Sequence, residues 1–103
     1  MSVDFAPGNG RRAGTWSLIV GAAAIAILIT TLVPYLTISK DAPDIARSIA
    51  TYALAIGFAI AVLLHLVGFV LGVAALVRNG DSKLRGVLGL ILNAAAVLVE
   101  VGL

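Results

Sequence analysis

The chain has 103 residues, of which 61% are hydrophobic and 12% are charged, whereas a typical soluble domain carries about 25% charged residues. So little charge cannot cover a folded surface in water, which excludes an ordinary soluble domain. The net charge is only +2, with no basic patch interleaved with aromatic residues, so nucleic acid is not an expected partner. The absence of cysteine excludes disulfides, thiolate catalysis and Cys-ligated metal centres.

Three stretches of the chain carry no charged residue: 13–39, 48–77 and 86–99. An apolar run of roughly 18 or more residues is typical of a membrane-spanning helix, and the third stretch reaches that length when it includes the chain end. The sequence therefore predicts an all-α membrane protein, a bundle of three transmembrane helices at about 16–38, 43–77 and 84–102. A flexible tail, 1–15, precedes the transmembrane domain at 16–103.

The first predicted helix is framed by two aromatic residues. Trp16 and Tyr35 are 19 residues apart, or roughly 28 Å along a helix, which suits opposite interfaces of a bilayer core of about 30 Å. The end of this segment, Pro34-Tyr35-Leu36, offers no small-residue cleavage site, so we expect the segment to be retained rather than removed as a signal peptide.

The two loops carry helix-capping residues. Asp41 is expected to cap the second helix, with Pro43 in its first turn and Asp44 completing a capping box; Asp44 and Arg47 have the i,i+3 spacing of an ion pair. In the second loop, Asn79-Gly80 suits a helix end and Asp81 or Ser82 can begin the next helix. That loop is short, so the helices on either side of it must be neighbours.

The Lys and Arg residues indicate the orientation in the membrane. Five of the seven lie in the tail and second loop, namely Arg11, Arg12, Arg78, Lys83 and Arg85. Lys40 and Arg47 lie near the first loop. The positive-inside rule then predicts a cytoplasmic N-terminus and an up-down-up path.

Each predicted helix has one face of small or polar residues and one bulky face. In lipid, small residues allow helix backbones to approach closely, so these faces are expected to pack against each other or against a partner. The pattern includes a G-x-x-x-G, Gly68 to Gly72. The faces are Ser17, Gly21, Ala24, Leu28 and Thr31; Gly57, Ala61, His65, Gly68, Gly72 and Ala75; and Gly86, Gly89, Asn93, Ala96 and Glu100.

His65 is the candidate functional residue, because an ionisable side chain near the centre of a membrane helix is costly and is functional by default. The plain structural interpretation is a hydrogen bond between His65 and Asn93 at similar depth. A second hypothesis is a proton or ion relay from His65 to Glu100. The distance opposes the relay, since Glu100 is expected near the outer interface, reaching headgroups or pairing with Lys40 or Arg47.

The segment from Ala61 to His65 resembles the A-x-x-x-H pattern of bacterial light-harvesting polypeptides. That resemblance implies His65 as an axial ligand to a tetrapyrrole, a haem or a chlorophyll-type magnesium; no cofactor at all is the default expectation. Residues 72–93 resemble the glycine-rich hairpin of small uncharacterised bacterial multi-span membrane proteins, with Gly72, Arg78, Gly86, Gly89 and Asn93 carrying the likeness. This second resemblance implies a bacterial inner-membrane location and no known activity.

No nucleophile–base set, phosphate loop or metal cluster is visible in the sequence, so we expect a protein that is not an enzyme. The leading hypothesis is an accessory or structural subunit of a larger membrane complex, in contact with lipid and other membrane subunits. One alternative is a pigment- or haem-binding antenna or electron-transfer component centred on His65. The other is a small homo-oligomeric transporter or channel.

Overall fold

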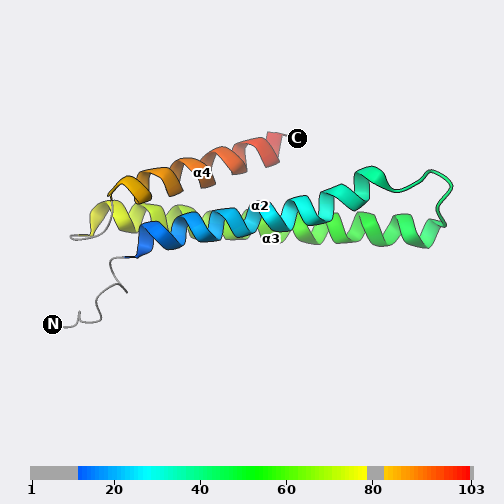
Figure 1. Cartoon of the computed structure of the whole chain (residues 1–103), viewed down its shortest axis with the longest axis horizontal. Helices are drawn as coiled ribbons and strands as arrows, with labels where there is room; N and C mark the ends of the chain where they lie inside the picture. The colour runs from blue at the N-terminus through cyan, green and yellow to red at the C-terminus, as the bar shows by residue number, and fades with distance from the viewer. Residues whose placement is uncertain (1–11, 79–82, 103) are drawn as a thin grey trace.

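A computed structural model describes residues 12–78 and 83–102 of the chain. This described part is all-helical, with three helices: α2 at Ala13–Thr37, α3 at Asp44–Val77 and α4 at Lys83–Gly102 (Figure 1). Each is long and apolar enough to cross a membrane, with mean hydropathies of 2.3, 2.7 and 1.9 over a stretch of 18 residues in α2, α3 and α4. The expectation of an all-α protein with three candidate spans is therefore confirmed.

The helix starts differ from those expected. α2 begins at Ala13, three residues before Trp16, and both Ala13 and Gly14 are buried. They belong to the packed bundle because Gly14 faces the start of α4, where an added Cβ would lie 2.8 Å from the amide nitrogen of Gly86. The remainder of the expected tail, 1–11, and the expected caps at 79–82 lie outside the described residues.

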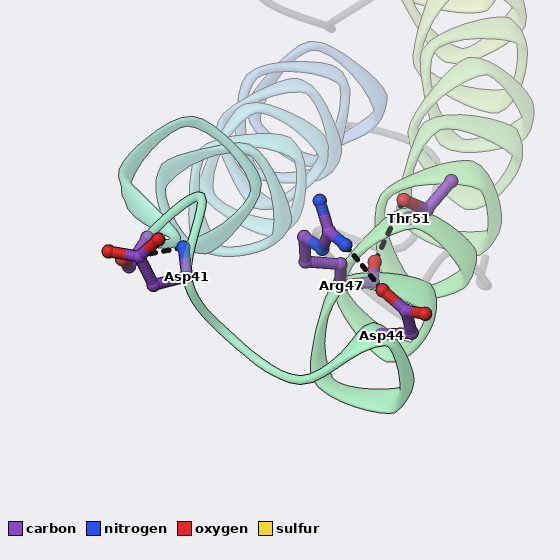
Figure 2. Close-up of polar contacts among 5 residues, drawn as sticks. Asp41, Asp44, Arg47 and Thr51 are labelled. Atoms are coloured by element: carbon purple, nitrogen blue, oxygen red, sulfur yellow. Dashed lines mark hydrogen bonds and ion pairs between the residues drawn. The ribbon is translucent and has the colours of Figure 1, made fainter.

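The capping of α3 by Asp41 was predicted wrongly. The N-cap position is Pro43, which has no side-chain capping bond, and the backbone N–H of Asp41 donates to Ser39 Oγ at 3.1 Å. Pro43 fixes the extended backbone before the helix, so α3 begins one residue later than expected. Figure 2 shows the ion pair between Asp44 and Arg47 that the spacing predicted.

α2 and α3 lie side by side along their length (Figure 1). Near one end, Ser17 Oγ donates to the carbonyl of Gly68 at 2.6 Å. Further along, Thr31 fills the space in front of Gly57, where an added Cβ would collide with its side chain. These two contacts bring the backbones together where lipid supplies no hydrophobic drive.

α4 packs against both other helices and ends beside the middle of the α2–α3 pair (Figure 1). Arg85 Nη1 donates to Thr15 Oγ1 at 3.0 Å, which places the starts of α2 and α4 together. The outward faces carry large hydrophobic side chains such as Ile29, Leu63 and Leu98, exposed by 53%, 62% and 74%. Such a surface is compatible with contact with the hydrocarbon of a bilayer.

Candidate functional site: a buried polar chain across three helices

Four polar side chains occupy the interior of the bundle. Ser17, His65 and Asn93 are fully buried, and Glu100 is 5% exposed. The buried non-polar residues of the described chain are all alanines or glycines. The interior therefore consists of small residues, which allow close backbone contact, and of these four polar side chains. We refer to Ser17, Asn93, His65 and Glu100 together as the polar chain.

Asn93 connects α4 to the other two helices, and its bonds fix the orientation of its amide. Nδ2 donates to the carbonyls of Gly89 at 2.7 Å and Ser17 at 3.1 Å, with Ser17 Oγ at 3.3 Å. Because the amide nitrogen is committed to carbonyl acceptors, Oδ1 faces the His65 ring, 2.9 Å from Nδ1. An amide oxygen only accepts, so Nδ1 carries a hydrogen and donates it to Asn93.

Two glycines leave room for this amide. A Cβ on Gly68 would lie 2.5 Å from Asn93 Oδ1 and Nδ2, and one on Gly21 would lie 2.9 Å from Oδ1. Real Cβ atoms do not approach other atoms so closely. Glycine at both positions is therefore a geometric requirement of the polar chain.

The other ring nitrogen of His65 meets the carboxyl group of Glu100. Nε2 lies 2.9 Å from Oε2. If neither atom carried a hydrogen, two acceptors would face each other and repel. A hydrogen bond of 2.9 Å between them therefore requires one proton, on either Nε2 or Oε2. The pair is either a neutral imidazole with a carboxylic acid or an imidazolium with a carboxylate; its net charge is zero in both forms.

The prediction that Glu100 lies out of reach of His65, near the interface with Lys40 or Arg47, is wrong. The contacts of Gly86 with Gly72 and of Gly68 with Asn93 set a register in which Glu100 lies level with Ala61. Side chains lean toward the N-terminus of their own helix. His65 therefore leans toward the level of Glu100, and Glu100 leans back toward His65.

The second carboxyl oxygen of Glu100 has no partner. Oε1 is buried and makes no hydrogen bond with any described residue. Glu100 also contributes to the wall of an apolar groove of about 500 Å³ between α2 and α4. The other lining residues are hydrophobic, among them Leu28, Ile29, Leu32, Ala95, Ala96 and Val99.

The surroundings of His65 bear directly on the tetrapyrrole hypothesis. An axial ligand needs a free ring nitrogen, and both nitrogens are in hydrogen bonds at 2.9 Å in a side chain with no exposed surface. Ligation through Nε2 would require the Glu100 bond to break and the bundle to open. Among residues 12–78 and 83–102, no three His, Asp or Glu side chains gather as a metal site.

Sequence reasoning placed eleven residues on the small faces of α3 and α4, and Ala96 alone among them is only half-buried. The other ten are buried: Gly57, Ala61, His65, Gly68, Gly72, Ala75, Gly86, Gly89, Asn93 and Glu100. Sequence reasoning missed the participation of Ser17 in the polar chain and the groove beside Glu100. The Ser17 side chain carried a signal, because it shares the small face of α2. The groove carried none, because it depends on how far apart two bulky faces lie.

Comparison with known proteins adds no constraint on function. No family model matches this chain, and neither the curated proteins nor the solved structures contain a match.

Proposed function

We propose that this protein is a small non-enzymatic subunit of a larger membrane complex, with an accessory or structural role. In this proposal it crosses a bacterial inner membrane three times, up-down-up, with its N-terminus in the cytoplasm. The described Arg12, Arg78, Lys83 and Arg85 support that orientation, since they lie at the helix ends that would face the cytoplasm.

The observation that carries the proposal is the inward closure of the polar groups. Ser17, Asn93 and His65 use their polar atoms on one another and on backbone carbonyls. The membrane-facing surface is left to large hydrophobic side chains. A bundle of this kind has a hydrophobic outer surface without reactive groups, which suits packing against other membrane helices.

The test is native mass spectrometry of the tagged protein, purified gently from its own membranes. The expected result is a second polypeptide in fixed stoichiometry, recovered again when that polypeptide carries the tag. The control variant is Gly102→Ala, because an added Cβ there meets nothing within 4 Å. Recovery of this chain without another polypeptide, from membranes of several lipid compositions, would overturn the accessory role.

A homo-oligomeric transporter is the second candidate, favoured by one observation. The His65–Glu100 pair holds a shared proton inside the bundle, and Glu100 borders an open groove. Ionisable groups at such depth are typical of proton pathways. Proteoliposomes that conduct protons with the native chain and lose this conductance with His65→Ala would support this candidate over the first. A proton conductance that is unchanged by His65→Ala would rule it out.

The antenna or electron-transfer hypothesis has less support, because neither nitrogen of His65 is available. It requires a visible absorption band in the purified protein that disappears in His65→Ala. A colourless protein, purified without harsh detergent, would exclude a bound tetrapyrrole.

A further inference from the structure

We propose that the groove between α2 and α4 binds an apolar molecule ending in a neutral hydroxyl group, which donates a hydrogen bond to Glu100 Oε1. This inference goes beyond the accessory role and does not depend on it. It rests on two observations of Glu100: the residue lines an otherwise hydrophobic groove, and its Oε1 is buried and unpartnered among the described residues.

Glu100 Oε1 requires a hydrogen-bond donor. The proton shared with His65 lies between Nε2 and Oε2, so Oε1 is an acceptor whether the carboxyl group is charged or neutral. A buried acceptor without a donor is destabilising. The occupant of the groove must therefore bring a hydrogen-bond donor.

The donor must be electrically neutral. The His65–Glu100 pair has a net charge of zero in both of its forms, so a cationic ligand would leave one uncompensated charge in an apolar surrounding. Such a charge is expensive inside a membrane. A neutral donor, such as an alcohol or a phenol, meets the need of Oε1 without that penalty.

Glu100 lies well away from the end of α2 that carries Tyr35. Ser17 faces Gly89 and Gly21 faces Asn93, and the same register places Glu100 level with Leu28. Tyr35 is seven residues further along α2, or about 10 Å. A lipid headgroup at the interface marked by Tyr35 is too far away, so the donor belongs to a molecule that inserts its polar end into the hydrocarbon layer.

The groove has the size and lining of a site for a small apolar molecule. A groove of about 500 Å³ is within the size range of small-molecule sites, which are commonly apolar with a few placed polar groups. Ile29 and Leu32 offer branched surfaces on one side, and Ala95 and Ala96 leave space on the other. The polar contact is confined to Glu100, so the ligand needs one donor and an apolar body.

The experiment compares 4-octylphenol with 4-octylanisole, its methyl ether, which has a similar body and no donor. Binding to the full chain in lipid nanodiscs is measured by isothermal titration calorimetry. The wild-type protein is expected to bind the phenol about 2- to 13-fold more tightly than the ether, the range for one net hydrogen bond. Equal affinities, or no binding of either probe, would overturn the proposal.

Four variants locate the site. Leu28→Trp fills the groove and should abolish binding of both probes. Glu100→Met removes Oε1 and should abolish the preference for the phenol. Glu100→Gln keeps an oxygen acceptor and should retain that preference, which preserves the test if Glu100→Met does not fold. Val70→Trp is the matched control, since Val70 lines a separate apolar hollow without polar residues; loss of binding there would overturn the assignment.

Infrared spectroscopy supplies a second readout. Glu100 is the only glutamate in the chain, so a side-chain ¹³C label on glutamate marks this single carboxyl group. Addition of the phenol should shift the labelled band, and addition of the ether should not. A phenol that binds in the calorimeter without moving this band occupies another site, and the proposal is then wrong.

Discussion

His65 Nε2 and Glu100 Oε2 lie 2.9 Å apart, although 35 positions separate the two residues in the chain. Each is the only residue of its type in the sequence. Asn93, seven positions before Glu100, holds the other ring nitrogen. α4 therefore supplies both partners of the one histidine, and spectroscopy can observe each member of the pair without overlap.

The tautomer of His65 is the first prediction. Asn93 Oδ1 accepts from Nδ1, so in Glu100→Gln, where the amide can donate to Nε2, the ring should be neutral with its hydrogen on Nδ1. Solid-state ¹⁵N NMR of histidine-labelled protein measures this directly. A neutral ring with its hydrogen on Nε2 would mean that the Asn93 amide is reversed.

The close approach at Gly68 gives the second prediction. Gly68→Ala places a Cβ against the Asn93 amide, and such overpacking should lower the free energy of unfolding by about 1–3 kcal/mol. Reversible unfolding in mixed SDS and mild-detergent micelles measures the change. Gly102→Ala adds the same methyl group with nothing within 4 Å and should stay near the native value; equal losses in both variants would contradict the argument.

The coupling between Asn93 and His65 is the third prediction. A double-mutant cycle with Asn93→Ala and His65→Ala should give an interaction free energy of roughly 0.5–1.7 kcal/mol, the range found for hydrogen bonds between membrane helices. The control cycle pairs His65→Ala with Thr30→Val, since Thr30 donates to the Ala26 carbonyl of its own helix at 2.7 Å. The control should be additive, and strong coupling there would indicate a general loosening of the bundle.

Lys83 gives the fourth prediction, at the end of α3. Its Nζ donates to the carbonyls of Leu76 at 2.7 Å, Arg78 at 2.8 Å and Ala75 at 3.3 Å. A cation on terminal carbonyls stabilises a helix end by about 0.3–1 kcal/mol. Lys83→Met should therefore speed amide hydrogen exchange over the last turn of α3, whereas Lys40→Met should leave that turn unchanged; exchange rates equal to wild type would rule out this capping role.

The helices and their inward faces could be predicted from the sequence because one physical property determines each. Uncharged runs define the spans, and a row of small residues defines the face that another backbone can approach. His65 and Asn93 lie on such rows at similar distances from the second loop, so their contact follows from a hairpin of neighbouring helices. The level of Glu100 and the groove beside it needed information that no single segment contains.

The depth of Glu100 depends on where α4 lies against α3. Its distance in residues from the chain end predicted a position at the membrane interface. The contact of Gly68 with Asn93 instead sets the level of Glu100 along α3. The prediction that Asp41 caps α3 is wrong for a local reason. Pro43 fixes the backbone just before the helix, so Asp41 lies too far from the first free N–H groups of α3. The groove beside Glu100 depends on the distance between two bulky faces, which composition does not reveal.

The positions of His65 and its two partners along the chain also bear on how α3 enters the membrane. α3 precedes α4 in the chain, and both partners of His65 lie on α4. Chain order alone therefore leaves the imidazole without these two partners until α4 is synthesised, and a polar group is costly to leave unpaired in an apolar surrounding. Insertion of α3 and α4 as a pair would let the histidine enter lipid together with both of its partners.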